Sequence, residues 1–308
     1  MCAQYAPAAG KPGSTALRHD SSCFVAWANR CKVSRGYMDL SMPDSGYASV
    51  GDSLSACGPA MQNGVLSLGD GGMATLQFES PVKNGSGWDF AVFENTFLDS
   101  FLELAFVEVS SDGSRFVRFP AVSLTDTTLQ TGSFGYTKPE HINNLAGKYI
   151  VGYGTPFDLE ELRDSAGIDL NSITHVRVVD VVGSMNPNHA RRDSRGTKIN
   201  DPWPTRFPSS GFDLDAVGVI HTNQSRTQYS AYENRRFSMK NPVENKTIQF
   251  MFNDKNTAAF CIYHSTGVRV FSFQAVPGYN EIKIHIPSGL YYISEENKMS
   301  LSVPVMIH

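Results

Sequence analysis

The hydrophobic pattern of this chain consists of short apolar runs separated by turn residues, which predicts a protein built from β-strands. Each run is rich in β-branched or aromatic residues and is bounded by Gly, Pro, Asn or Asp, the pattern typical of strands joined by turns. Before residue 223 the clearest runs are 64–68, 73–78, 88–95, 102–110, 115–119, 173–182 and 212–220. Residues 173–182 are apolar almost throughout, which favours a central position in a sheet.

Helical periodicity is nearly absent. Only residues 158–163 predict a short helix, whereas 120–171 and 183–211 carry few strand signals and are interpreted as long loops. Many strands with long connections predict an all-β fold, a jelly-roll-like β-sandwich. Loops of this length in a compact domain tend to be functional or to be held by ions.

A second group of short strands follows residue 237 and predicts a separate small domain. The expected strands are 246–252, 258–263, 268–273, 281–286 and 290–293. Their length and spacing favour a small Ig-like antiparallel β-sandwich. We therefore divide the chain into a domain at 1–222, a polar linker at 223–236 and a second domain at 237–308.

Composition narrows the class of protein. The chain has 308 residues, a net charge of −4 and a hydrophobic share of 41%, values of a folded protein whose charge gives no reason to expect nucleic acid as a partner. No apolar run reaches the length of a transmembrane helix. The five cysteines lack a Cys-x-x-Cys pair, which argues against a zinc ribbon. Two alternatives stay open for Cys23, Cys31 and Cys57: one disulfide, with Cys31–Cys57 preferred, or free thiols.

Acidic residues interrupt or end several apolar strands. They are Glu94, Asp180, Asp213 and Asp215. A carboxylate buried alone is costly, whereas Ca²⁺ satisfies such groups because it binds six to eight oxygen ligands. We therefore expect a structural calcium ion that clamps the loops near 96–101 and 183–211. The alternative is that these carboxylates cap loops by accepting backbone N–H bonds, or pair with Arg177, Arg191 and Arg206.

Aromatic residues in turn-rich segments are the candidate ligand-binding residues. They are Trp88, Phe134, Tyr136, Tyr153 and Trp203. Rings among Asn, Asp and Gly can stack on a sugar or a corrin-like ring while amides bond its edges. Alternatively, Trp203 packs between its two prolines onto the edge of the sandwich. No catalytic residue is assigned, because no nucleophile elbow or zinc-binding helix motif occurs and no carboxylate pair stands out for glycoside hydrolysis.

The second domain resembles a known export signal. Its opening Asn241-Pro242-Val243, its centre IYHSTGVRV and its end IPSGLYYI resemble the C-terminal sorting domain of the type IX secretion system of Bacteroidetes. The chain departs from that pattern at His264, where an Asp is usual, and in a tail that continues past Ile293. The resemblance implies the type IX machinery as a partner and an extracellular or outer-membrane surface location; an ordinary C-terminal β-domain is the alternative. Residues 1–4 lack the features of a signal peptide, which we expect to be absent or truncated here.

The first domain carries a second resemblance. The segments SLGDGG, DFAVFEN, LELAFVEVSSDG, NDPWP and GFDLDAVGVI are similar to a family of Bacteroidetes cell-surface proteins, over about residues 4–222. That family implies a surface-exposed binding domain, and its association with cobalamin uptake implies a cobalamin-like ligand and a TonB-dependent outer-membrane transporter as a further partner. The loop aromatics suit a glycan as the other ligand. Two other functions stay open: an extracellular glycan-active hydrolase on a jelly-roll scaffold, and a structural or adhesive surface component.

Overall fold

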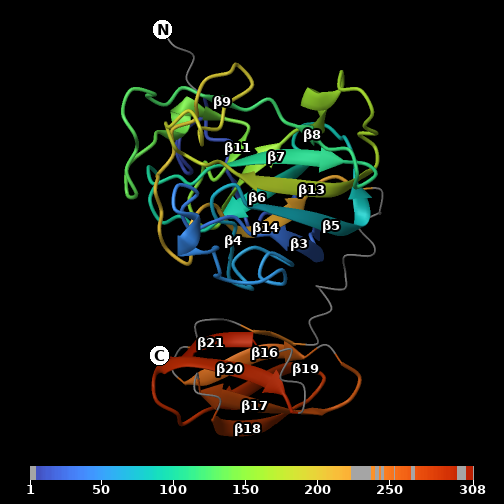
Figure 1. Cartoon of the computed structure of the whole chain (residues 1–308). Coiled ribbons are helices and arrows are strands. Elements are labelled where there is room, and N and C mark those ends of the chain that lie inside the picture. The colour runs from blue at the N-terminus through green and yellow to red at the C-terminus, as the bar shows by residue number, and fades with distance from the viewer. Residues whose placement is uncertain are drawn as a thin grey trace. The chain divides into compact units, whose positions relative to one another are not determined.

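The structure is all-β, as the sequence predicts. This computed structural model describes residues 5–222, 237–239, 243, 246–252, 254–264, 268–296 and 303–307. Within those ranges the helical elements are three short 3-10 turns: η1 (Pro43–Ser45), η2 (Pro139–His141) and η3 (Leu159–Leu162). The chain divides into two compact units, residues 1–225 and 226–308 (Figure 1), and each is described by itself.

The N-terminal unit contains two six-stranded antiparallel sheets. The first has the order β1 (Leu17–Arg18), β12 (Tyr153–Phe157), β6 (Phe90–Glu94), β14 (Asp213–Val219) and β2 (Ala26–Trp27), with β4 (Leu66–Ser67) paired to β14. The second has the order β11 (Leu145–Ala146), β7 (Ala105–Ser110), β13 (Ile173–Asp180), β5 (Met73–Val82) and β3 (Arg30–Ser34), with β8 (Val117–Arg118) paired to β7. The nearly continuous apolar strand, β13, is central, as predicted.

Successive long strands alternate between the two sheets. The chain passes from β5 to β6, to β7, then from β12 to β13 and to β14, so each sheet receives every second strand of this series. This alternation gives the jelly-roll-like sandwich that the pattern predicts. Aromatic rings fill its interior: Phe157 lies 5.4 Å from Phe90 and 5.0 Å from Phe119 between ring centroids.

Strands β6 and β14 are buried on both faces. The N-terminal segment covers the outer face of the first sheet, where Phe24 and Trp27 pack against Phe93, Ala91 and Ala216. The Trp27 and Phe93 ring centroids are 5.4 Å apart. This explains why β6 before Glu94 and residues 216–219 of β14 carry no polar side chain, rather than alternating.

The short strands are what the pattern misses. Residues 120–171, interpreted as loop, contain β9 (Val122–Ser123), β10 (Ile142–Asn143), β11 and β12, and 5–36 contains β1 to β3. Most of these have two residues: β1, β2 and β11 each pair with a longer strand, and β9 and β10 pair with each other. The helix predicted at 158–163 is the 3-10 turn η3, whose Asp158 side chain accepts a bond from the Glu160 N–H. Cys23, Cys31 and Cys57 are free thiols, so the Cys31–Cys57 disulfide is not formed.

The C-terminal unit is a small antiparallel sandwich of two sheets. One has the order β15 (Phe237–Met239), β16 (Thr247–Phe252) and β19 (Gly278–Lys283); the other has β18 (Arg269–Ala275), β17 (Ala258–His264), β20 (Gly289–Glu295) and β21 (Val303–Ile307). Phe260 stacks on Phe273 at 5.7 Å in the core between them. Strand β19 begins three residues before the predicted 281. The predicted linker at 223–236, the Asn241-Pro242 start and the turn at 265–267 lie outside the described residues.

Candidate functional site

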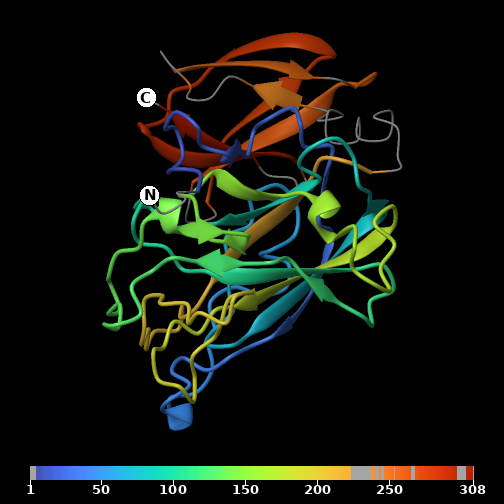
Figure 2. The same cartoon turned by 90° about the horizontal axis from the view of Figure 1, so that it is seen from above.

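One end of the N-terminal unit gathers its longest loops, and we call it the loop end. Strand register brings the ends of five strands there, namely β5, β6, β7, β13 and β14. Asp180 at the end of β13 pairs with Ala105, the first residue of β7. Leu214 near the start of β14 pairs with Glu94, where β6 ends. Met73, the first residue of β5, pairs with Val179. Figure 2 shows the yellow excursion 183–211 and the blue segment of η1 at this end.

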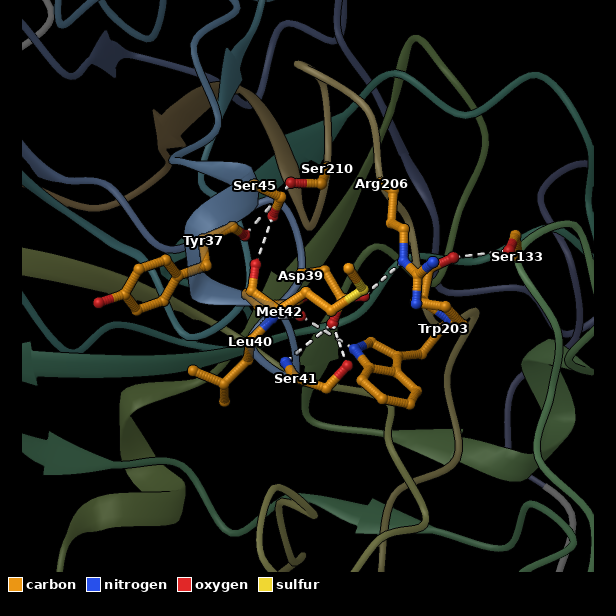
Figure 3. Close-up of polar contacts among 12 residues, drawn as sticks. Tyr37, Asp39, Leu40, Ser41, Met42, Ser45, Ser133, Trp203, Arg206 and Ser210 are labelled. Atoms are coloured by element: carbon orange, nitrogen blue, oxygen red, sulfur yellow. Dashed lines mark hydrogen bonds and ion pairs between the residues drawn. The ribbon is translucent and has the colours of Figure 1, made fainter.

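Hydrogen bonds tie three of these loops together (Figure 3). The indole Nε1 of Trp203 donates to Asp70 Oδ2 at 2.9 Å, and Ser133 Oγ donates to the Pro204 carbonyl at 2.6 Å. Arg206 Nε donates to Asp39 Oδ2 at 2.6 Å. The loops at 37–48, 131–137 and 202–210, together with the turn 69–72, therefore form one connected structure, in which Asp39 and Asp70 are buried acceptors.

Glycine places Asp70 in this structure. The turn 69–72 has Gly69 and Gly71 at φ +75° and +72°, a conformation that other residues adopt at a cost. A Cβ on Gly72 would lie 1.9 Å from the Leu68 carbonyl oxygen. The GDGG sequence thus holds Asp70 where it accepts from the Leu40 N–H at 2.8 Å as well as from Trp203.

An exposed group of apolar side chains lies on the loops at this end, and we call it the aromatic surface. Phe134 is 72% exposed, yet its ring centroid lies 6.4 Å from that of Phe101 and 6.0 Å from that of Phe207. The Thr137 N–H donates to the Ser100 carbonyl at 2.6 Å, which holds two of the contributing loops side by side. The rings of Phe101, Phe134 and Phe207 form its centre, and we include the exposed apolar side chains of the same or adjoining loops, Phe97, Leu98, Leu129 and Tyr136.

Four buried carboxylates and one half-buried carboxylate, Glu103, lie at or near strand ends and in the excursion at the same end. Glu94 ends β6, Glu103 shortly precedes β7, and Asp201 lies in the excursion before Trp203, while Asp180 and Asp213 occupy strand ends. Burial raises the pKa of each of them, and like charge adds to the effect because Glu94, Asp213, Asp201 and Asp180 all act on Glu103. We call these five residues the acidic cluster.

All four residues predicted to bind calcium make other bonds, and Glu94 accepts from the Thr96 N–H at 2.9 Å. Asp180 accepts from the N–H groups of Gly71 at 2.9 Å and Phe212 at 2.8 Å. Asp215 accepts from the Met61 N–H at 3.0 Å through both oxygens, and Asp213 accepts from the Ser67 hydroxyl. The bonds from backbone N–H groups are those of the capping alternative, whereas the Asp213 bond joins two side chains. Among the described residues, no three His, Cys, Asp or Glu side chains form a preassembled metal site.

The predicted ligand-binding residues fall into two groups. Phe134 and Tyr136 lie on the aromatic surface, and Trp203 is half-buried beside it, with its ring 6.4 Å from that of His189. Trp88 precedes β6 at the end of the strand opposite Glu94, and Tyr153 is half-buried in β12 rather than in a loop. The loop end therefore brings together three of the five predicted residues.

Sequence reasoning missed several residues of this region. Phe97, Leu98 and Phe101 belong to the segment NTFLDSF, in which apolar residues alternate with loop-forming Asn, Asp and Ser. That composition was a usable signal, because a connection between strands is normally polar. Glu103 and Asp201 carry no comparable signal, since Glu103 stands between two leucines like a residue of an alternating strand, and Asp201 stands between Asn200 and Pro202 like an ordinary loop residue.

Comparison with known proteins assigns no family. No family model and no curated protein matches the chain. Among solved structures, a β-glucuronidase from Ruminococcus gnavus in complex with uronic isofagomine matches with 9% identity and a TM-score of 0.23, covering 98% of this chain and 45% of that one. The BSP domain of a biofilm-associated protein matches with 10% identity and a TM-score of 0.18, covering 94% and 52%. The chain spans about half the length of these structures, and similarities this low carry no functional argument. Across the described residues, no helix is long and apolar enough to cross a membrane.

Proposed function

We propose that the N-terminal unit is a ligand-binding domain and that its aromatic surface binds a glycan. The observation that carries this proposal is the run of rings Phe101, Phe134 and Phe207, at 6.4 and 6.0 Å, on loops held by hydrogen bonds to a rigid sandwich. Exposed apolar groups gathered in one place mark interaction sites more often than chance exposure does. Loops on a rigid scaffold are where binding residues normally lie.

The chemistry around the rings favours a sugar over a purely apolar ligand. Hydroxyl side chains, among them Ser100 and Thr131, stand beside the aromatic residues in the same loops, whereas Gln130 and Ser133 bond to the protein itself. An aromatic ring packs against the C–H face of a sugar, while such groups bond its hydroxyls. A cobalamin-like molecule is the second ligand to test, because a flat macrocycle with amide edges needs the same two kinds of contact.

Export belongs to the same proposal. The C-terminal unit supports it as a compact sandwich in which the centre IYHSTGVRV runs from β17 toward β18 and IPSGLYYI leads into β20. In this proposal the type IX machinery carries the protein to the cell surface, where the N-terminal unit binds its ligand. If the cell takes up that ligand, a TonB-dependent transporter is the partner that receives it.

A hydrolase is favoured less by the geometry. Glycoside hydrolysis needs two carboxyl groups that face the scissile bond and reach water. Glu94 and Asp201 are 1% and 3% exposed, so they cannot meet a glycan that lies on the aromatic surface. The loop end is therefore better suited to binding than to turnover.

The proposal is tested by a ligand screen of the full chain. Oligosaccharides, cobalamin and haem are compared by thermal shift, and the ligands that raise the melting temperature are measured by titration calorimetry. We expect a glycan to bind wild type and the Trp88→Ala variant equally, and Phe134→Ala more weakly. Retained binding by Phe134→Ala would place the site elsewhere, and release of reducing sugar from a glycan would favour the hydrolase.

A further inference from the structure

The outer face of the second sheet carries a line of mostly basic side chains. Strand register places Arg118 of β8, Glu108 of β7 and Arg177 of β13 opposite one another, and the line continues through Thr75 of β5 to Lys32 of β3. Residues directly opposite in antiparallel strands point to the same face, so these five side chains lie side by side across the sheet (Figure 1). We call them the basic row.

A second line of residues runs beside the basic row, two positions away on each strand. His175 of β13 stands there between Ser110 of β7 and Gln77 of β5, and Gln77 is opposite Arg30 of β3. Arg30 and Lys32 are exposed, and β3 is an edge strand of the sheet. The second line therefore adds a fourth cation, together with hydroxyl, amide and imidazole groups.

The four cations of the two lines are matched there by one carboxylate. Glu108 Oε1 accepts from Arg118 Nε at 2.9 Å, and Glu108 Oε2 accepts from Arg177 Nε at 2.5 Å. Both guanidinium groups also contact Glu108 through Nη2, so Nη1 of each can donate to a further anion. The next acids in the chain, Glu79 and Asp112, lie two residues beyond the second line. The centre of this face is therefore cationic, although the whole chain carries a net charge of −4.

Two aromatic rings hold the arginine side chains in place. The guanidinium carbon of Arg118 lies 4.0 Å from the centroid of the Phe106 ring, and that of Arg177 lies 3.7 Å from the centroid of the Phe116 ring. Stacking on a ring and bonding to Glu108 orient each guanidinium before a ligand arrives, which lowers the entropy cost of binding. The same stacking occupies the rings, so the bases of a single-stranded nucleic acid cannot stack on them.

We propose that this face binds an acidic polysaccharide, with Arg118, Arg177 and Lys32 contacting its anionic groups. Neighbouring strands lie about 4.8 Å apart, so successive cations of the basic row are two strands, or about 10 Å, apart. One pyranose sugar advances a polysaccharide by about one strand spacing, so this interval matches a chain with an anionic group on every second sugar. Thr75, between two of the cations, can bond a hydroxyl of the intervening sugar. The site lies on a sheet face and does not rest on the aromatic surface.

The experiment measures the affinity of the full chain for hyaluronan and heparin oligosaccharides by titration calorimetry. Both carry a uronate on every second sugar, without sulfate in hyaluronan and with sulfate in heparin. We expect wild type to bind at low ionic strength and less tightly as salt is added, because exposed charges are screened. Arg30→Glu/Lys32→Glu should weaken binding at least about tenfold, since each exposed ion pair contributes up to about fivefold in affinity and each reversal adds a repulsion. Its melting temperature should stay close to that of wild type, because both positions are exposed.

Lys11→Glu/Arg18→Glu is the matched control. It changes the net charge by the same amount, but Lys11 lies in the N-terminal segment and Arg18 in β1, an edge strand of the first sheet. This variant and Phe134→Ala should bind both polysaccharides as wild type does, which separates this face from the aromatic surface. Equal affinities of the two double variants would overturn the proposal, as would a loss confined to Phe134→Ala. A wild type that binds neither polysaccharide, or binds single-stranded DNA instead, would also overturn it.

Discussion

Replacing Trp203 with Phe removes a single hydrogen bond from the loop end and keeps an aromatic ring in place. The indole Nε1 donates to Asp70 Oδ2 at 2.9 Å, and Asp70 is 4% exposed, so water cannot substitute freely for the lost donor. A hydrogen bond to a charged group contributes about 1.5–3 kcal/mol. For a unit of this size, about 2–4 °C of melting temperature corresponds to each kcal/mol, so Trp203→Phe should melt about 3–12 °C below wild type.

Thermal unfolding followed by circular dichroism measures the effect, with Trp88→Phe as the control. Trp88 is the partly exposed tryptophan at the other end of β6 and should tolerate the same change with little loss. The Leu40 N–H still donates to Asp70 in the variant, so the loop 37–48 should remain folded. Equal melting temperatures for the two variants would refute the argument, because the Trp203 bond would then contribute nothing to stability.

Two further predictions concern pH and export. Burial raises the pKa of Asp215 to about 6, so the folded state binds a proton at Asp215 more tightly than the unfolded chain does. The free energy of unfolding therefore falls as pH rises from the ordinary aspartate pKa of about 4 through the raised value. Measured by urea unfolding, the free energy of unfolding of wild type should fall by about 3 kcal/mol relative to that of Asp215→Asn between about pH 4 and pH 7. Equal pH dependence in the two proteins would contradict this. Deleting residues 237–308 should leave the N-terminal unit folded but confined to the periplasm of a type IX-competent host, as judged by fractionation; normal surface display of the truncated protein would exclude a sorting role.

Much of the fold is predictable because its long strands carry their own signal. The run that forms β13 buries Ile173, Val176 and Val178 and lies at the centre of its sheet, and the predicted runs 102–110 and 115–119 contain β7 and β8. Strands such as β9 and β11 have two residues each, and the pairing that creates them is a property of the tertiary structure.

The candidate site is predictable only in part, for a related reason. Phe134 and Tyr136 stand out because exposed rings are rare among Gly, Ser and Thr, but Phe207 is separated from them by some seventy positions, and only the folded chain brings its ring 6.0 Å from Phe134. Asp201 and Glu94 are likewise distant in sequence, and their shared electrostatic environment arises when β6 and the excursion 183–211 meet at the loop end. Which carboxylates cap loops, as Asp180 does, is decided by backbone N–H positions that no sequence pattern specifies.

The most direct test of the binding surface is titration calorimetry of a glycan with wild type, Phe134→Ala, Phe207→Ala and the Trp88→Ala control. Each exposed ring that stacks on a sugar should contribute about 1–3 kcal/mol, by analogy with aromatic stacking on nucleic-acid bases, which corresponds to a loss of affinity of about fivefold to 150-fold per substitution. The account predicts this loss of affinity for both Phe134→Ala and Phe207→Ala. Phe134→Ala should keep the wild-type melting temperature, and Trp88→Ala should keep the wild-type affinity. Wild-type affinity in both phenylalanine variants, or a loss confined to Trp88→Ala, would contradict it.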